Sequence, residues 1–226
     1  MIPAVMFDLD ETLFDRSSSL RIFIQQQFLR IAIGRFRNFN ELADRFLQLD
    51  NRGRVSKRDV YRTIVDEIGS SNEHLAGDLF DDYEVNAWRY ARPFEDTRDT
   101  LLWLRNAGIK TAIVSNGQTH IQLRTLLALN LDRLVDTYLI SEQEGCRKPD
   151  AAIFLKAAER LSVKVEDCLF VGDSPEADIL GARSVGMRTV WFPNGAEWPH
   201  AYSFEPSATI SRLQELRPII EHWHRA

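Results

Sequence analysis

The second half of the chain alternates short apolar runs with segments of helical periodicity, and this alternation limits the possible folds more than any other feature. We expect strands over residues 110–115, 135–140, 168–171 and 188–191, with a helical segment between successive strands. Strands that alternate with helices connect through right-handed crossovers and build a parallel sheet. The sequence therefore predicts an α/β fold around a mostly parallel sheet.

The stretch Ala4–Asp15 starts with a further apolar run and then presents two acids, Asp8 and Asp10, on either side of Leu9. Successive strand residues face opposite sides, so the two carboxylates would share a face if the strand continued. At about 4 Å two like charges repel by about 4 kcal/mol at an effective dielectric of roughly 20. The pair thus indicates a cation site with a nucleophilic carboxylate, and the alternative is a surface turn that happens to carry acids.

Polar residues follow other predicted strands as well. Ser115 ends the strand over residues 110–115, and Asp173 follows the strand over residues 168–171 after a glycine. In sheets of this kind, ligands bind beyond the carboxyl ends of the strands. We therefore expect Asp8, Ser115 and Asp173 to meet at one edge of the sheet. Taken alone, Ser115 could belong to an ordinary turn and Asp173 to a helix N-terminus.

Residues 16–92 form a predicted insert of about four helices between the first strand and the alternating half. Apolar residues recur there at helical spacing, Asn40 is a candidate N-cap, and Ser56 with Asp59 three positions later resembles a capping box. Pro93 stops the last of these helices. The predicted division is a core made of residues 1–15 and 93–226 and a helical domain made of residues 16–92.

The composition limits the kinds of partner and compartment. A formal net charge of −5 argues against a nucleic-acid binder, because such proteins are usually basic. The two cysteines of the 226-residue chain are too few for a disulfide framework, so we expect a cytoplasmic protein in a reducing compartment. The N-terminal residues lack a signal-peptide pattern, and no apolar run reaches the roughly 18 residues of a membrane span. The oligomeric state is left open.

Four short motifs occur in order, each after its expected element. They are Asp8-Leu9-Asp10-Glu11-Thr12, Ser115-Asn116-Gly117, Lys148-Pro149, and Gly172-Asp173 with Asp178 following. In this order they resemble the haloacid dehalogenase-like hydrolase superfamily. The resemblance implies a Rossmann-like three-layer core and makes the insert an all-helical cap domain. The pattern of residues 8–15 is similar to the branch with nucleoside monophosphatases and N-acylneuraminate-phosphate phosphatases.

The resemblance implies phosphoryl transfer through a covalent intermediate. In its terms Asp8 is the nucleophile that forms an aspartyl-phosphate, and Asp10 is the general acid for the leaving oxygen and then the base for the attacking water. Mg²⁺ is expected on the Asp8 carboxylate, the Asp10 backbone carbonyl and Asp173, since hard oxygen ligands suit this ion. The expected activity is Mg²⁺-dependent hydrolysis of a small phosphorylated metabolite.

The remaining motif residues would bind the phosphoryl group or support those that do. By the same resemblance Lys148 neutralises the nucleophile and the phosphate, and the Ser115 hydroxyl and the Asn116 backbone N–H hold phosphate oxygens. Thr12 is placed in the phosphate-binding set and also caps the turn. Asp178 is expected to orient Lys148 or a metal-bound water rather than to bind the metal itself.

Other activities stay open at this point. A phosphomutase or another phosphoryl transferase needs the same pair of aspartates, and the choice depends on how well the cap excludes water. Dehalogenases of the superfamily lack an acid two residues after the nucleophile, so Asp10 speaks against them. Phosphonate cleavage would use a cap lysine, for which Lys57 is the one candidate. The insert does not fit a signalling receiver module, and the complete acid set argues against a binding protein on an inactive scaffold.

The insert is the relatively basic part of an acidic protein. Residues 16–92 hold 12 Arg and one Lys against 11 Asp and Glu, a net charge of +2, so the rest of the −5 chain carries −7. Arg52 and Arg54 lie in a loop on either side of Gly53. Guanidinium groups suit carboxylate or phosphate ligands, so we expect Arg52 or Arg54 to recognise the leaving group of the substrate. The alternative is an ordinary solvated helix face.

Overall fold

The computed structural model describes residues 2–31 and 38–225. The chain forms two compact units, which are residues 1–14 with 93–226 and residues 15–92. The assignment of these units to a catalytic core and a cap domain stays a prediction, and residues 32–37 of the predicted cap lie outside the described residues. Every helix among the described residues is too short or too polar to cross a lipid bilayer.

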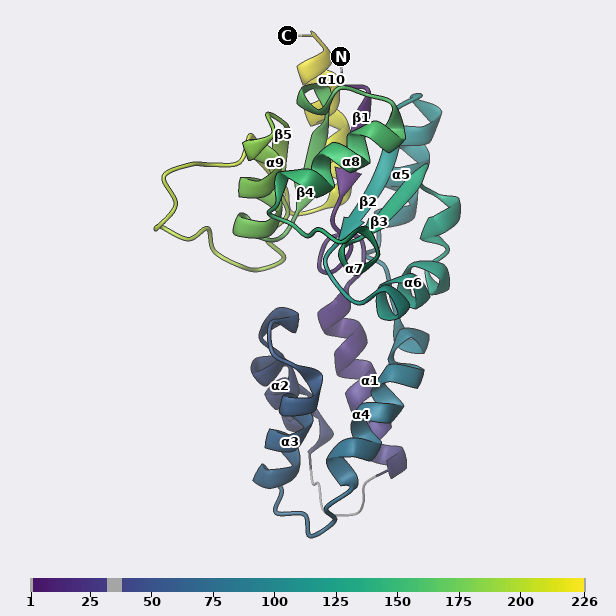
Figure 1. Cartoon of the computed structure of the whole chain (residues 1–226), viewed down its shortest axis with the longest axis vertical. Helices are drawn as coiled ribbons and strands as arrows, with labels where there is room; N and C mark the ends of the chain where they lie inside the picture. The colour runs from purple at the N-terminus through teal and green to yellow at the C-terminus, as the bar shows by residue number, and fades with distance from the viewer. Residues whose placement is uncertain (1, 32–37, 226) are drawn as a thin grey trace. The chain divides into compact units, whose positions relative to one another are not determined.

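The first unit is built around one six-stranded sheet (Figure 1). Its strands are β1 (Ala4–Phe7), β2 (Lys110–Ser115), β3 (Thr137–Ile140), β4 (Leu169–Gly172), β5 (Arg188–Trp191) and β6 (Ala208–Thr209). Neighbouring strands pair in parallel throughout, in the order β3-β2-β1-β4-β5-β6. The predicted α/β class and parallel sheet are therefore confirmed.

β1 lies in the interior of the sheet, between β2 and β4. Met6 is paired with Ala112 on one side and with Phe170 on the other. All of β1 is buried, which is typical of a parallel strand covered on both faces and explains its continuous apolar sequence. The carboxyl end of β1, where Asp8 follows, is thereby fixed between two neighbouring strand ends.

Helices cover both faces of this sheet (Figure 1). They are α5 (Thr97–Asn106), α6 (Thr119–Ala128), α7 (Ser141–Glu144), α8 (Ala151–Leu161), α9 (Gly181–Ser184) and α10 (Leu216–Arg225), with 3₁₀ turns at Leu131–Arg133, Val165–Asp167 and Leu213–Glu215. α8 and α9 pack on one face, where Met6, Val114 and Phe170 meet Phe154 and Ala182 in a buried cluster. α5 packs against β2 and contacts the turn before α10.

The segment after β4 departs from the continuous helical segment expected between the strands over residues 168–171 and 188–191. Pro175–Leu180 forms a π-helical turn instead, and α9 follows it. The Ser174 carbonyl accepts hydrogen bonds from Asp178 N at 3.0 Å and from Ile179 N at 3.2 Å. π-Helical turns are rare overall, but those that occur are often found at functional sites. This one sets the position of Asp178. The sequence pattern also fails to predict β6, α7 and α10.

The second unit is a helical bundle with an aromatic core. Its described helices are α1 (Arg16–Ile31), α2 (Phe39–Asp50), α3 (Lys57–Glu67) and α4 (Leu75–Asn86), with 3₁₀ turns at Asn51–Gly53 and Ala87–Tyr90. Phe23, Phe46, Tyr61 and Tyr83 are buried, and their rings meet in tilted or edge-to-face pairs. Such pairs stabilise a core beyond the area they bury, so this unit has a core of its own.

Two predicted N-caps of this unit are wrong in detail. α2 is capped by Asn38, whose side-chain oxygen accepts from the backbone N–H groups of Asn40 and Glu41. Asn38 has the extended backbone that an N-cap needs, with φ −146° and ψ 97°, and the sequence does not reveal this. Ser56 lies at the N-cap of α3 but makes no capping hydrogen bond through its side chain, so it forms no capping box with Asp59.

A buried ion cluster joins the start of α1 to the end of α2. Arg16 donates two hydrogen bonds to Asp50, from Nη1 to Oδ2 at 2.7 Å and from Nη2 to Oδ1 at 3.1 Å. Lys57 forms a second ion pair with Asp50, and Gly53 N donates to Asp50 Oδ2 at 2.8 Å. Burial raises the pKa of Asp50, but the hydrogen bonds and charges of Arg16 and Lys57 outweigh it and hold that pKa below its usual value.

Candidate active site

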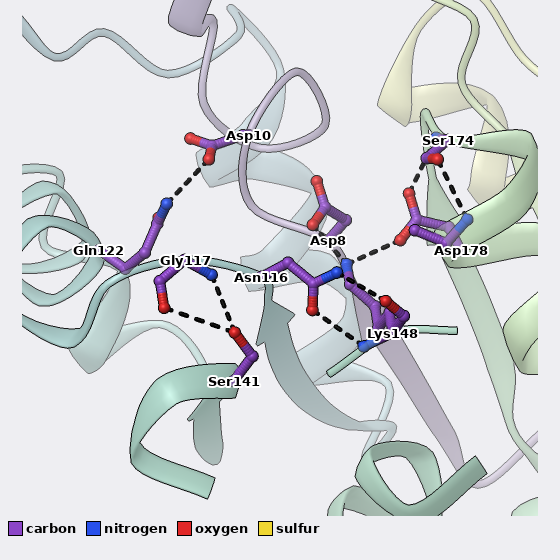
Figure 2. A network of polar contacts seen from close by, with 10 residues as sticks. Asp8, Asp10, Asn116, Gly117, Gln122, Ser141, Lys148, Ser174 and Asp178 are labelled. Carbon is purple, nitrogen blue, oxygen red and sulfur yellow. Dashed lines mark hydrogen bonds and ion pairs between the residues drawn. The ribbon is translucent and has the colours of Figure 1, made fainter. Parts of the chain in front are cut away.

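Asp8 follows β1 at the carboxyl edge of the sheet and begins a tight loop. Its backbone N–H donates to the Val171 carbonyl at 2.9 Å, which continues the pairing with β4. The Leu9 carbonyl then accepts from Leu13 N at 3.0 Å and from Phe14 N at 2.9 Å, so the chain turns back on itself. Asp8 is 7 % exposed, and its carboxylate belongs to the polar network drawn in Figure 2.

Glu11 holds this loop in an uncommon conformation. Its φ of 62° lies in the left-handed region, where a residue other than glycine is strained by roughly 1 kcal/mol. The buried Glu11 carboxylate accepts a hydrogen bond of 2.5 Å from Asn194 Nδ2, which lies in the loop after β5. This contact stabilises the turn that presents Asp8 and Asp10.

Lys148 lies between two aspartates. Its ammonium Nζ is 2.5 Å from Asp8 Oδ1 and 2.7 Å from Asp178 Oδ1, and all three residues are buried. Burial lowers the pKa of Lys148, but the charges of Asp178 and Asp8 outweigh it and raise that pKa well above its usual value. The ammonium therefore stays charged and lies where it neutralises Asp8.

The acids around Asp8 give the site an excess of negative charge. Burial is the largest influence on the pKa of Asp8 and raises it, the charge of Lys148 lowers it, and three other aspartates raise it again. The balance holds the pKa of Asp8 well above its usual value. Positive charge in addition to that of Lys148 would therefore favour the ionised form of Asp8. The three aspartates are Asp178, Asp173 and Asp10.

Asp178 is fixed by contacts with both of its carboxylate oxygens. Oδ2 accepts a hydrogen bond from Ser174 N at 2.9 Å, while Oδ1 faces Lys148. Gly172 is needed beside it, because a Cβ at that position would lie 2.4 Å from the Asp178 carboxyl group. These contacts suit the supporting role expected of Asp178, which stays a prediction.

The Asn116 side chain holds the backbone of Lys148. Its Nδ2 donates to the Lys148 carbonyl at 2.8 Å, and its Oδ1 accepts from Lys148 N at 2.9 Å. The peptide bond between Lys148 and Pro149 is cis. The Asn116 amide thus ties the end of β2 to the loop that carries the lysine, whereas the sequence suggested a role for its backbone alone.

Two buried hydroxyl groups, one in the loop after β1 and one on the last residue of β2, have no hydrogen-bond partner among the described residues. They are Thr12 Oγ1 and Ser115 Oγ, on residues that are 0 % and 1 % exposed. Buried polar groups are normally hydrogen-bonded, so an unpaired one calls for a ligand or a water molecule. Thr12 and Ser115 are two of the residues expected to bind phosphate, and their unpaired hydroxyls are compatible with that role.

Asp10 has a partner that sequence reasoning missed. Gln122 Nε2, from α6, donates a hydrogen bond to Asp10 Oδ2 at 2.9 Å (Figure 2). Gln122 is 7 % exposed and lies 112 positions away in the sequence. The proposed acid is therefore held by a side-chain amide from another element.

The donor set at this edge fits a divalent cation such as Mg²⁺. Asp8, Asp173 and Asp178 each offer one carboxylate oxygen, and these atoms lie within 4.8 Å of one another. Two of these three carboxylates, those of Asp8 and Asp178, contact the Lys148 ammonium, and hard oxygen ligands suit Mg²⁺. Asp178 is the least suited of the three as a ligand, because Lys148 and Ser174 engage both of its carboxylate oxygens, whereas Asp8 contacts Lys148 through Oδ1.

A comparison with protein families decides where this arrangement belongs. The family model for haloacid dehalogenase-like hydrolases matches residues 2–186, which is most of the chain. The chain belongs to the haloacid dehalogenase-like hydrolases. The resemblance stated from the motifs is thereby confirmed, and the match extends from β1 through the helical insert to the segment that carries Asp173 and Asp178.

Relatives within this hydrolase family include proteins named as phosphatases. The glyceraldehyde 3-phosphate phosphatase of Methanopyrus kandleri is 29 % identical over 97 % of each chain. The ribulose-1,5-bisphosphate 5-phosphatase of Halopiger xanaduensis is 31 % identical over 97 % of this chain and 100 % of that protein. The glyceraldehyde 3-phosphate phosphatase of Pyrococcus furiosus is 37 % identical, but the match covers 62 % of this chain and 59 % of that protein.

Solved structures of haloacid dehalogenase-like hydrolases share this fold. A phosphatase from Thermococcus onnurineus is 28 % identical, with a TM-score of 0.64 and coverage of 96 % of this chain and 97 % of the other. A hydrolase from Bacillus subtilis bound to magnesium has a TM-score of 0.76 at 23 % identity, with the same coverage. The Rossmann-like α/β class predicted from the sequence is therefore confirmed.

The site of this hydrolase collects residues from several strand ends. Asp8, Lys148 and Asp178 are in direct contact, and Asp173 belongs to the same acidic group. The roles assigned to these residues stay predictions. Arg52 and Arg54 belong to the helical unit, and their recognition of the substrate also stays a prediction.

Three residues that hold the site were not predicted from the sequence. Gln122 binds Asp10, Asn194 binds Glu11, and Trp191 Nε1 donates to the Asp173 carbonyl at 2.8 Å. The Trp191 ring also packs edge-to-face on Trp198. Gln122 shares the buried side of α6 with Thr125 and Leu126, and the sequence alone does not mark it as buried.

Proposed function

We propose that this hydrolase is a Mg²⁺-dependent phosphatase that cleaves a small phosphomonoester through an aspartyl-phosphate on Asp8. The coarse activity has direct support, because the chain belongs to a hydrolase family and relatives that match 97 % of its length are named as phosphatases. On these grounds the chain is a phosphoric monoester hydrolase. The metal, the covalent route and the roles of single residues form the proposal.

The observation that carries the mechanism is the buried contact between Asp8 and Lys148. Oδ1 of Asp8 lies 2.5 Å from Lys148 Nζ, which leaves Oδ2 as the candidate nucleophilic oxygen. A carboxylate can act as a covalent nucleophile and split one difficult transfer into two easier ones. The ammonium stabilises negative charge on the phosphoryl oxygens, and such electrostatic stabilisation supplies most of the catalysis in phosphoryl transfer.

In the first step an oxygen of Asp8 attacks phosphorus in line with the bond to the leaving group. A bond forms between Asp8 and phosphorus, and the bond to the leaving oxygen breaks with its electron pair. Asp10 donates its proton to that oxygen, so the product is a neutral alcohol. The Ser115 hydroxyl, the Asn116 backbone N–H and Thr12 are assigned to the phosphoryl oxygens.

In the second step Asp10, now ionised, takes a proton from water while the water oxygen attacks phosphorus. The bond to Asp8 breaks, which restores its carboxylate, releases inorganic phosphate and leaves Asp10 protonated for the next cycle. Lys148, held by Asp178, neutralises the carboxylate in both steps. Asp8, Asp173 and the Asp10 backbone carbonyl are the residues that would hold Mg²⁺, which would supply the additional positive charge that clustered carboxylates and a phosphate need.

The proposed substrate is a small phosphorylated metabolite. Relatives named for glyceraldehyde 3-phosphate and ribulose 1,5-bisphosphate make short phosphorylated sugars the first compounds to test. Nucleoside monophosphates and N-acylneuraminate phosphates belong in the same panel, because the pattern of residues 8–15 resembles enzymes acting on them. The cytoplasmic location and the absence of nucleic-acid and membrane partners stay predictions.

The test is release of inorganic phosphate from such a panel, before and after removal of divalent cations. We expect turnover that disappears on chelation and returns with Mg²⁺. Full turnover after exhaustive chelation would reject Asp8 and Asp173 as ligands of an essential cation. Asp10→Asn tests the acid, because single-turnover phosphorylation should fall strongly for an alkyl phosphate and much less for an activated aryl phosphate. Equal losses for both would reject Asp10 as the acid.

A phosphomutase is the second candidate, because it would use the same Asp8 and Asp10. Its main product would be an isomeric phosphate ester rather than inorganic phosphate, and the same assay separates the two. Two structural neighbours are 2-haloacid dehalogenases, at 25 % and 23 % identity. Asp10 argues against that chemistry here, and release of halide from a 2-haloacid would overturn the argument.

A further inference from the structure

The Asp10 carboxylate has one hydrogen bond among the described residues, and it comes from Gln122. Nε2 of Gln122 donates to Oδ2 of Asp10 at 2.9 Å. Figure 2 shows the Gln122 amide pointing at this carboxylate. Gln122 lies in the first turn of α6, where its backbone N–H binds the Gln118 carbonyl at 3.0 Å. A fixed helix therefore carries the donor.

The approach of Gln122 depends on Gly117. A Cβ at position 117 would lie 2.6 Å from Gln122 Nε2 and 2.8 Å from Gln122 Cγ, which is closer than side chains tolerate. Gly117 is itself held by Ser141, whose Oγ accepts from Gly117 N at 3.0 Å. The missing side chain at position 117 thus leaves the space that the Gln122 amide occupies on its way to Asp10.

The Gln122 amide presents a defined end to Asp10. An ionised carboxylate can only accept hydrogen bonds, so the NH₂ end of the amide must face it. The other end, Oε1, is buried and has no partner among the described residues. A buried oxygen without a partner is unfavourable, and an apolar side chain of similar size would avoid that penalty. The contact to Asp10 supplies a reason for an amide at this position.

We infer that Gln122 is a positioning residue for Asp10, which selects the side-chain rotamer from which Asp10 exchanges its proton with the leaving group. The inference rests on the proposed function, because that mechanism makes Asp10 the acid. Hydrogen bonds to the Leu9 carbonyl already hold the loop backbone, but the Asp10 carboxyl still has two torsions to fix. A displacement of about 1 Å at a reacting group can slow a step by roughly 100-fold.

The test compares Gln122→Met, which keeps the length of the side chain and removes the donor, with wild type in single-turnover phosphorylation. The two substrates are glycerol 3-phosphate, with a poor leaving group, and para-nitrophenyl phosphate, with a good one. We expect a loss of roughly tenfold or more in the rate for glycerol 3-phosphate. The single-turnover rate for para-nitrophenyl phosphate should change by less than about twofold. The KM values of both substrates, measured in steady-state turnover, should also change by less than about twofold. Gln118→Met, on the exposed residue one turn earlier, is the matched control and should match wild type.

Gly117→Ala is the second variant, because its new Cβ should displace the Gln122 amide while the Asp10 side chain stays unaltered. It should show the same selective loss for glycerol 3-phosphate, which keeps the inference testable if Gln122→Met folds poorly. Equal losses for the two substrates, a change in KM alone, or wild-type rates in both variants would overturn the role of Gln122. Asp10→Asn separates the two ideas. Without a leaving-group-selective loss in that variant, the proposed role of Asp10 as the acid fails, whereas a selective loss in Asp10→Asn alone rejects only Gln122.

Discussion

Replacement of Asp50 by asparagine should destabilise the helical unit by about 3 kcal/mol at neutral pH, because it leaves two largely enclosed cations without their shared anion. The Asp50 side chain is 1 % exposed and faces Arg16 and Lys57. Removal of one partner from a buried ion pair costs about 3–5 kcal/mol. The side chains of Arg16 and Lys57 are 10 % and 12 % exposed, so water can solvate part of their charge and the lower end applies.

The cost of Asp50→Asn should also depend on pH, with a definite sign. The pKa of Asp50 in the folded protein lies below its ordinary value of 3.8, so the unfolded chain takes up that proton first. The stabilisation from the ionised carboxylate is therefore complete above the ordinary value and disappears as the pH falls through the lowered pKa. The difference in unfolding free energy between wild type and Asp50→Asn should be constant near pH 7 and shrink below about pH 4.

Urea unfolding followed by circular dichroism at a series of pH values measures this difference. Asp44→Asn is the matched control on the same helix, because Asp44 pairs with Arg21 at 2.5 Å while the two side chains are 59 % and 40 % exposed. Its cost should stay within about 1 kcal/mol. Equal costs for the two variants, or a cost of Asp50→Asn that grows toward acid pH, would refute the reasoning.

Other perturbations address the site and the insert. Asp8→Asn should lower phosphate release by several orders of magnitude while the fold persists, and wild-type turnover would reject the covalent route. Ca²⁺ should support little turnover in that assay, because it accepts more ligands at longer distances and can occupy both Asp8 oxygens. Gly172→Ala should cost about 1–3 kcal/mol in urea unfolding and reduce activity, since its Cβ would meet a carboxyl group at 2.4 Å, whereas Gly77→Ala has open space and should do neither. Arg52→Ala and Arg54→Ala should raise KM for the physiological substrate and spare a small aryl phosphate, and equal effects on both would reject their role.

The strands could be predicted because a parallel strand buried on both faces is a short continuous apolar run. The predicted runs over residues 110–115 and 188–191 coincide with β2 and β5, while β3 begins two residues later than expected and β4 one residue later. β6 has two residues and is defined by its pairing with β5, so it leaves no pattern of its own in the sequence. The π-turn after β4 was missed because its apolar spacing resembles that of an α-helix.

The grouping of the strand-end acids could be predicted, because parallel strands bring their carboxyl ends to one edge. The side chains that hold them could not. Gln122 lies 112 positions from Asp10 and Asn194 lies 183 positions from Glu11, and no periodic pattern links residues so far apart. Glu11 shows the difficulty most clearly, because its left-handed φ would suit glycine or asparagine, and the contact with Asn194 becomes visible only in three dimensions.

Neutral side chains hold much of the charged site. The amide of Gln122 binds Asp10, that of Asn194 binds Glu11, and that of Asn116 binds the backbone of Lys148. A neutral amide fixes the position of a charged neighbour without changing the total charge nearby, whereas an acid or a base in its place would shift the pKa of every group around it. The proposed binding of a divalent cation and a phosphate among clustered carboxylates would need such a fixed charge balance. The amides can therefore set the geometry of the site independently of its charge.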